Sequence, residues 1–235
     1  MELLARLAED PRSAAIFLDV DGVLAPIVPR PEDARVPDEL RAELRRLATA
    51  YGLVACVSGR ASADAQAIVG VAELTYVGNH GLELEPEAQE WTGRMAGFLA
   101  EVGWPRAENK GLTASFHYRD MRDEAGARRE LDAIAEQARA EGFVARYGRK
   151  VLGVVPPRAA SKGTAVRRLL EEHNLTRALY AGDDTTDLDA FAAVQELELG
   201  IRVAVASPEG PAALRQQADV VLDAQTDMLG LLRRL

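Results

Sequence analysis

The stretch Ile16-Phe17-Leu18-Asp19-Val20-Asp21-Gly22-Val23-Leu24 places two carboxylates one residue apart at the end of an apolar run. The run is typical of a buried strand, and a loop is expected to begin at Asp19. Because residues i and i+2 of an extended chain share a face, Asp19 and Asp21 should project together where the strand ends. Open α/β sheets bind ligands at the carboxyl ends of their strands. Two carboxylates this close repel unless a divalent cation or a shared proton intervenes, so the stretch predicts a reactive site.

An Asp-x-Asp-Gly sequence also has two plainer interpretations. Asp and Gly suit tight backbone geometry, so the segment is also compatible with a simple turn. A calcium loop is the other alternative, but it needs more oxygen ligands in about the next ten residues, ending in a bidentate Glu. The chain continues instead with the apolar Val23-Leu24-Ala25-Pro26. This disfavours calcium, and three downstream segments favour chemistry over a turn.

The first of these is the apolar run Leu53-Val54-Ala55-Cys56-Val57, which is followed by Ser58, Gly59 and Arg60. It predicts a second parallel strand and then a helix that starts near Ala61 and Ser62. The Ser58 hydroxyl and the free N–H groups of that helix are suited to binding phosphate oxygens. Ser58 is also a common residue type for capping a helix, and this segment alone favours the capping role.

The second segment, Ser161-Lys162-Gly163-Thr164, opens a helical pattern for which Asn174 is the expected stop. Lys162 would lie in the first turn, where the helix dipole favours negative charge. The placement therefore calls for an anion or a carboxylate as partner. The alternative is a solvated surface lysine.

The third segment, Leu179-Tyr180-Ala181-Gly182-Asp183-Asp184-Thr185-Thr186-Asp187, is a strand-like run that ends in three carboxylates within five residues. Such clustering is unfavourable unless a cation such as Mg²⁺ lies among the carboxylates. An Asp-rich helix start is the alternative, but a single capping Asp would be enough for that purpose.

Taken in order, these four motifs resemble those of the haloacid dehalogenase superfamily of phosphohydrolases. Three further stretches narrow the resemblance to the trehalose-6-phosphate phosphatase family, and the similarity spans nearly the whole chain. The resemblance implies a Rossmann-like core with a parallel sheet and a smaller inserted α/β cap of the C2 type. It also implies a phosphoric monoester hydrolase of trehalose biosynthesis. The three stretches are PRPEDARVPDEL at 29–40, VGNHGLE at 77–83, and KG at 110–111 with FHYR at 116–119.

The resemblance also assigns roles to residues. It makes Asp19 the nucleophile and Asp21 the general acid and then base, with Ser58, Gly59 and Lys162 holding the phosphate. An aspartyl-phosphate would divide hydrolysis into two easier displacements. The implied Mg²⁺ site comprises Asp19, the backbone carbonyl of Asp21, Asp183, Asp184 and Asp187, the last two supporting either the metal or Lys162. The candidate substrate contacts, each with a plainer interpretation as an ordinary surface or strand residue, are Arg60, Asn79, His80, Lys110, His117 and Arg119.

Three positions depart from the family pattern, at Gly153, Val155 and Leu188. The family usually carries Glu, a basic residue and Glu, respectively, at these places. Because sites that bind sugar hydroxyls discriminate strongly, losing polar groups should loosen or redirect specificity. Trehalose 6-phosphate is the leading substrate. The alternatives are another glycosyl or sugar phosphate, a catalytically weak sugar-phosphate-binding module, or a phosphotransferase.

Strand-like runs alternate with helical patterns along most of the chain, which predicts a parallel sheet. We expect the core to comprise residues 1–81 and 158–235 and the inserted cap to comprise 82–157, which would set substrate specificity. The expected core strands are 15–19, 53–57, 74–78, 178–182, 201–205 and 219–222, with helices at 38–50 and 227–235. The expected cap elements are strands at 112–118, 143–146 and 151–155 and a helix near 123–141.

Composition limits the remaining possibilities. The net charge of −9 disfavours nucleic acid and anionic membranes as partners. The chain has a single cysteine, Cys56, so an intramolecular disulfide is excluded, which fits a protein of the reducing cytosol. Cys56 lies in a predicted apolar strand and is expected to be buried. There is no apolar run of transmembrane length and no basic leader. We therefore expect a cytoplasmic monomer whose partner is a small-molecule sugar phosphate.

Overall fold

The computed structural model describes residues 2–28, 30, 33–119, 121, 123–148, 150–207 and 210–235. Pro29, Pro31 and Glu32 of the family-like stretch 29–40 lie outside these residues. The chain divides into two compact units. The larger unit comprises Met1–Gly81 and Ala160–Leu235, and the smaller unit, Leu82–Ala159, is inserted between them in the sequence.

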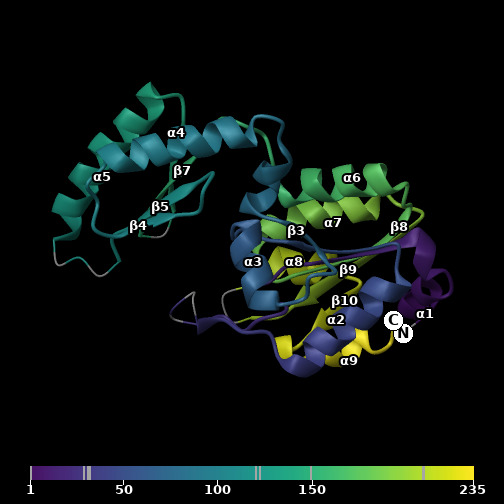
Figure 1. Ribbon diagram of the computed structural model, residues 1–235. Coiled ribbons are helices and arrows are strands. Elements are labelled where there is room, and N and C mark those ends of the chain that lie inside the picture. The colour runs from purple at the N-terminus through teal and green to yellow at the C-terminus, as the bar shows by residue number, and fades with distance from the viewer. Residues whose placement is uncertain are drawn as a thin grey trace. The chain divides into compact units, whose positions relative to one another are not determined.

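The larger unit is built on a six-stranded parallel sheet in the order β10-β9-β8-β1-β2-β3 (Figure 1). The central strand β1 pairs with β2 on one side and β8 on the other, and Leu18 is in register with both Cys56 and Ala181. Both β1 and β2 are buried along their whole length, which explains their continuous apolar sequences. The strands are β1 (Ala14–Leu18), β2 (Leu53–Val57), β3 (Thr75–Val77), β8 (Arg177–Gly182), β9 (Leu199–Val205) and β10 (Val220–Leu222).

Helices cover both faces of this sheet, with α6 and α7 on one face and α2 and α9 on the other (Figure 1). Helix α2 turns Leu40, Leu44 and Leu47 into the core, as their helical spacing predicts. The helices are α1 (Glu2–Ala8), α2 (Asp38–Ala50), α3 (Ser62–Val69), α6 (Lys162–His173), α7 (Leu188–Gln195), α8 (Ala212–Gln217) and α9 (Met228–Leu232). Short 3-10 turns occur at η1 (Pro11–Ser13), η3 (Asn79–Leu84), η4 (Thr185–Asp187) and η5 (Gln225–Asp227).

The smaller unit contains a four-stranded antiparallel sheet in the order β4-β5-β7-β6. Its side chains alternate between a buried face and a more open face, as expected when helices cover one side only. On the buried face, Phe116 packs edge-on against Phe98 of the covering helix, with ring centroids 6.2 Å apart. The elements are α4 (Ala88–Glu101), β4 (Ala107–Asn109), β5 (Ala114–His117), α5 (Glu124–Ala140), β6 (Val144–Gly148) and β7 (Val151–Val155).

The expected fold class, a parallel α/β core with a smaller α/β insertion, is confirmed. Helix α4 and strand β4 were not anticipated. The helix carries a signal in Trp91, Met95 and Phe98, which are spaced along one face and buried. Gly93 and Gly97 weaken that signal because glycine is a poor helix former. Strand β4 reads Ala-Glu-Asn, three residue types that are depleted in strands.

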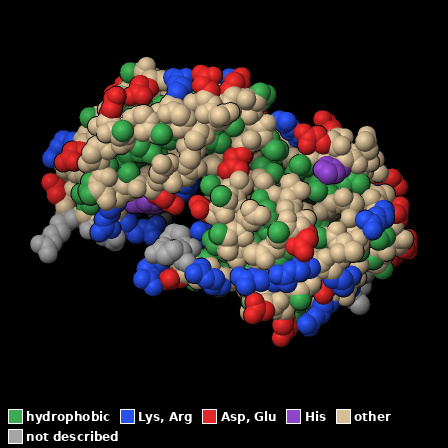
Figure 2. Space-filling view, viewed as in Figure 1, with side chains coloured by type: hydrophobic (Ala, Val, Ile, Leu, Met, Phe, Trp, Pro, Cys, Tyr) green, Lys and Arg blue, Asp and Glu red, His purple; other side chains and the backbone are tan. Residues whose placement is uncertain are grey.

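The surface carries both signs of charge. In the face shown in Figure 2, acidic and basic side chains are interspersed on each unit. Large exposed hydrophobic side chains, among the residues that the structure describes, are limited to Ile27 and Val221. None of the described helices combines the length and apolarity needed to cross a bilayer. Cys56 is buried, as expected, and burial is the main cause of the raised pKa of its thiol.

Candidate active site

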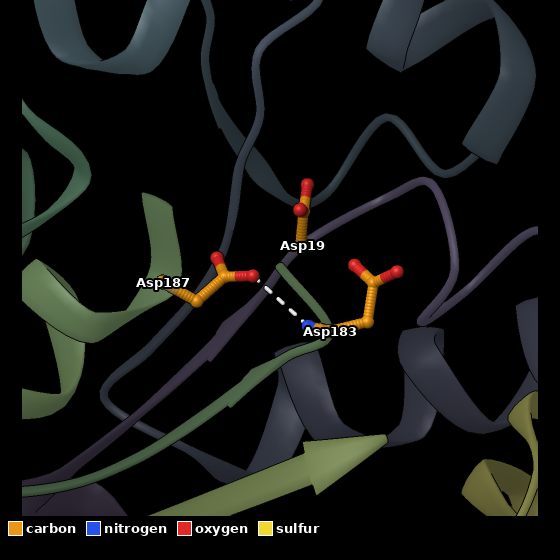
Figure 3. Close-up of side chains that lie close together, drawn as sticks. All are labelled: Asp19, Asp183 and Asp187. Carbon is orange, nitrogen blue, oxygen red and sulfur yellow. Dashed lines mark hydrogen bonds between the residues drawn. The ribbon is translucent and has the colours of Figure 1, made fainter. Parts of the chain in front are cut away.

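Three buried carboxylates gather where β1 and β8 end. Asp19 follows β1, Asp183 follows β8, and Asp187 closes the turn η4 (Figure 3). One carboxylate oxygen of each lies within 4.8 Å of the others. The arrangement follows from topology, because β1 and β8 are parallel neighbours and their carboxyl ends meet at one edge of the sheet.

Lys162, the first residue of α6, neutralises part of this negative charge. Its Nζ donates to Asp19 Oδ2 at 2.5 Å and to Asp187 Oδ1 at 2.7 Å. The side chain is 2% exposed, so the alternative of a solvated surface lysine is wrong. Burial alone would lower the pKa of Lys162, but Asp19 and Asp187 outweigh it and raise the pKa. The lysine is therefore a fixed buried cation beside Asp19.

Asp187 uses both carboxylate oxygens to hold its surroundings in place. Its Oδ1 accepts hydrogen bonds from Lys162 and from the Tyr180 hydroxyl, both at 2.7 Å. Its Oδ2 accepts from the backbone N–H groups of Asp183 and Asp184, both at 2.9 Å (Figure 3 draws the first). Because the Asp187 carboxylate already accepts four hydrogen bonds, it is better suited to orienting Lys162 and the loop that carries Asp183 and Asp184 than to binding a metal. Tyr180 was not singled out in the sequence, although a buried tyrosine hydroxyl requires a partner.

Asp183 has the character of a cation ligand. It is buried, and no described side chain donates a hydrogen bond to its carboxylate. Burial, followed by the charges of Asp19 and Asp187, raises its pKa to about 8. Burial likewise raises the pKa of Asp19 to about 7, against the opposing effect of Lys162. Two buried carboxylates with raised pKa values form a donor set that suits a hard divalent cation.

The loop after β1 is shaped to bring Asp183 close. Gly22 has a φ of 75°, a left-handed conformation that glycine adopts readily. A Cβ atom at this position would lie 2.1 Å from Asp183 Oδ2. The glycine of the Asp-x-Asp-Gly motif is therefore required both by the turn and by the carboxylate packed against it.

Asp21 lies outside the three-carboxylate cluster and pairs with Arg60. The guanidinium donates from Nε to Oδ2 at 2.6 Å and from a terminal nitrogen to Oδ1 at 2.7 Å. This two-pronged geometry is typical of arginine–carboxylate pairs. Asp184, the other candidate ligand outside the cluster, has an exposed side chain.

Ser58 is buried at the end of β2, and its Oγ accepts a hydrogen bond from the Arg60 N–H at 3.2 Å. The residue that caps α3 is Ala61, so Ser58 is not the cap of that helix. Asn79 and His80 lie beside this loop in the larger unit. Their N–H groups donate to the carbonyl oxygens of Arg60 and Ser58 at 2.8 and 2.9 Å, respectively.

The remaining candidates belong to the smaller unit. His117 and Lys110 both approach Glu108 Oε2, at 3.1 and 3.4 Å. Arg119 is exposed. Glu108 was not singled out in the sequence, and its place in the short strand β4 gives no strong signal. It is the acidic centre of a small polar cluster on the open face of this sheet.

The fold resembles that of a haloacid dehalogenase-like hydrolase from Bacteroides thetaiotaomicron, which superimposes with a TM-score of 0.61 at 16% identity over 94% of this chain and 98% of that one. The sequence profile of the trehalose-phosphatase family matches residues 17–101 and 105–224. The chain therefore belongs to the trehalose-phosphatase family, whose characterised activity is that of a phosphoric monoester hydrolase.

Individual relatives and a solved structure are similar to most of this chain. A Mycobacterium tuberculosis protein described as an uncharacterized glycosyl hydrolase is 34% identical over 82% of this chain, which spans only 16% of that protein. The maize trehalose 6-phosphate phosphatase RA3 is 28% identical over 88% of this chain and 67% of its own length. The C-terminal domain of the C. albicans trehalose-6-phosphate phosphatase superimposes with a TM-score of 0.68 at 21% identity, covering 98% of this chain and 95% of that one.

Proposed function

We propose that this protein is a Mg²⁺-dependent phosphatase that hydrolyses a sugar phosphate monoester through an aspartyl-phosphate on Asp19. Trehalose 6-phosphate is the leading substrate. The observation that carries the proposal is the buried contact of Asp19 with Lys162 at 2.5 Å, with Asp183 in the same cluster. A nucleophilic carboxylate, a fixed cation and a site for a divalent ion are the parts that phosphoryl transfer requires.

In the first step, Asp19 attacks the phosphorus atom and the sugar oxygen leaves with a proton from Asp21. In the second step, Asp21 takes a proton from water, which attacks the aspartyl-phosphate and releases inorganic phosphate. Lys162 and the Ser58 hydroxyl would bind the phosphoryl oxygens throughout. Arg60 donates two hydrogen bonds to Asp21, and a bound phosphate would compete with this carboxylate for the guanidinium.

The Mg²⁺ site would comprise Asp19, Asp183 and the backbone carbonyl of Asp21. When bound, the ion would neutralise charge on the transferring phosphoryl group. Asp187 would act on Lys162 and on the backbone of the loop, because its own oxygens are already occupied. Asp184 would support this loop from its exposed position.

Magnesium should stabilise the protein more strongly at high pH than at low pH. The pKa values of Asp19 and Asp183 rise from 3.8 to about 7 and about 8, so the folded metal-free protein binds more protons than the unfolded chain between these limits. Its free energy of unfolding should therefore fall as the pH rises through that window. Because ligands must lose their protons to bind a metal, the gain in Tm from Mg²⁺ should be larger near about pH 8.5 than near about pH 6. Thermal unfolding with Mg²⁺ or with a chelator measures this, and an equal gain at both values would argue against these two ligands.

The substrate is tested by phosphate release with and without Mg²⁺ across a panel of esters. The panel comprises trehalose 6-phosphate, sucrose 6-phosphate, glucose 6-phosphate, the phosphates of mannosyl and glucosyl glycerate, and p-nitrophenyl phosphate. A strong preference for trehalose 6-phosphate supports the leading assignment. Preference for another ester would redirect it, and tight binding without release would identify a sugar-phosphate-binding module.

We further propose that the smaller unit binds the sugar moiety and sets substrate specificity. The open face of its sheet would be the contact surface. Across this face, Glu108, Ser115, Gly153 and Arg146 lie in register on four successive strands. Residues directly opposite each other in antiparallel strands share a face. Gly153 therefore sits between Ser115 and Arg146. Among the described residues, the atom nearest to a Cβ placed at Gly153 would be the Arg146 carbonyl oxygen, at 3.7 Å.

Gly153→Glu should shift preference toward trehalose 6-phosphate. A Cβ atom at this position meets only ordinary contacts, and a carboxylate there would offer the sugar the acceptor that the family usually supplies. Because a charged hydrogen bond contributes about 1.5–3 kcal/mol, kcat/KM for trehalose 6-phosphate relative to p-nitrophenyl phosphate should rise about 10- to 150-fold. Gly153→Gln, which has the same size without the charge, should give a smaller shift. An unchanged ratio in Gly153→Glu would mean that other residues read the sugar.

A further inference from the structure

The segment Asn79–Gly81, which we call the elbow, has three consecutive residues with positive φ. The φ angles are 51° at Asn79, 54° at His80 and 99° at Gly81. Left-handed backbone is uncommon for residues other than glycine, and two such residues in succession are strained. Strain of this kind persists only where the surrounding structure enforces it, and it concentrates at functional sites.

The elbow is hydrogen bonded to the loop that carries Ser58. The Asn79 N–H donates to the Arg60 carbonyl at 2.8 Å, and the His80 N–H donates to the Ser58 carbonyl at 2.9 Å. The two bonds lie on either side of Gly59. The left-handed backbone thus aims two successive N–H groups at the loop Ser58–Arg60.

The imidazole of His80 covers Gly59 from the same side. A Cβ atom at Gly59 would lie 2.7 Å from His80 Cε1 and 2.8 Å from His80 Nε2. Gly59 does not have a positive φ. A side chain at position 59 would therefore meet the ring in its present position, and the ring packs against the loop at this glycine.

The elbow also contacts the helix that carries Lys162. A Cβ atom at Gly81 would lie 2.8 Å from the Ser161 carbonyl oxygen and 3.1 Å from Ala165 Cβ. Ser161 caps α6, and Lys162 is its first residue. One strained segment thus touches both elements that carry the phosphate-binding candidates Ser58 and Lys162.

We propose that His80 is a positioning residue, whose ring holds the loop Ser58–Arg60 in place for the phosphoryl group. The inference rests on the proposed function only in naming phosphate as the ligand of this loop. Because small misplacements of binding groups can cost about a hundredfold in rate, an elbow that fixes the loop has a measurable effect.

A double-mutant cycle at positions 59 and 80 tests this. His80→Asn keeps a residue type that tolerates positive φ but lacks the Cε1 and Nε2 atoms that face Gly59. We expect His80→Asn to weaken the binding of inorganic phosphate about tenfold. We expect Gly59→Ala to weaken phosphate binding about a hundredfold, because its methyl group meets the imidazole of His80. In the His80→Asn background, Gly59→Ala should cost less than about threefold, a non-additivity typical of residues in contact.

The measurement is the affinity of the intact protein for inorganic phosphate in the presence of Mg²⁺, by titration calorimetry, with Tm recorded for each variant. His173→Asn, at the exposed end of α6, is the matched control and should leave phosphate affinity unchanged. If His80 had only a structural role, its substitution would lower Tm, and the effects of the two substitutions on phosphate affinity would be additive. If His80→Asn does not fold, His80→Gly, which also suits positive φ, replaces it.

Additive losses in the cycle, or wild-type phosphate affinity in His80→Asn, would overturn the inference. Absence of phosphate binding by the wild-type protein would overturn it as well. The proposed function fails separately, if the wild-type protein binds inorganic phosphate but releases none from any ester. In that case the cycle still decides the role of His80.

Discussion

Asp19→Asn should lower phosphate release by about four orders of magnitude or more, because an amide cannot take up the phosphoryl group. The substitution nearly preserves the size of a buried side chain that contacts Lys162 and the Val20 N–H. The fold should therefore survive while turnover is lost. Initial rates at saturating ester and Mg²⁺, together with a thermal unfolding curve, separate the two effects.

Asp189→Asn provides the control for this substitution. Asp189 lies in the first turn of α7 with an exposed side chain, near the site in sequence but outside the buried cluster. It should retain wild-type turnover. Substantial turnover by Asp19→Asn would exclude Asp19 as the nucleophile.

Lys162→Met should both abolish turnover and destabilise the fold. It leaves Asp19 and Asp187 buried without the cation that they share. Removing one partner of a buried ion pair costs about 3–5 kcal/mol, and the free energy of unfolding of the metal-free protein should fall by about that amount. Urea denaturation in the presence of a chelator measures it.

Two further variants sharpen this prediction. Arg168→Met removes an ion pair of the same helix whose side chains are about half exposed, and it should cost less than about 1 kcal/mol. Asp187→Asn placed in the Lys162→Met background should recover part of the lost stability, because it removes one of the unpaired charges. If Lys162→Met were no more costly than Arg168→Met, the buried cation would not hold the cluster together.

The sequence predicted the core better than it predicted the insertion. The strand at 53–57 and the helix at 38–50 were expected and are present with those bounds. Fully buried parallel strands have long apolar runs, and an amphipathic helix repeats its leucines on one face, so both are visible locally. Helix α4 was missed because its two glycines offset the spacing of its aromatic residues.

At the site, the family resemblance anticipated that Asp19 and Asp183 would lie together, and the structure explains this because β1 and β8 are parallel neighbours. The different environments of Asp184 and Asp187 could not be anticipated, because they depend on how the turn η4 directs each side chain. The pairing of Asp21 with Arg60 joins residues 39 positions apart, and no local pattern reports it. Likewise, the contact of His80 with Gly59 requires a left-handed backbone at two non-glycine residues, which sequence propensities disfavour.

The most direct test of the proposed mechanism is to trap the covalent intermediate. The protein is mixed with Mg²⁺ and trehalose 6-phosphate carrying a radiolabelled phosphoryl group, quenched in acid within one turnover, and digested. The mechanism predicts a label that hydroxylamine removes, on the peptide that contains Asp19, and no label in Asp19→Asn. Rapid phosphate release without any labelled protein, or label on another residue, would contradict it.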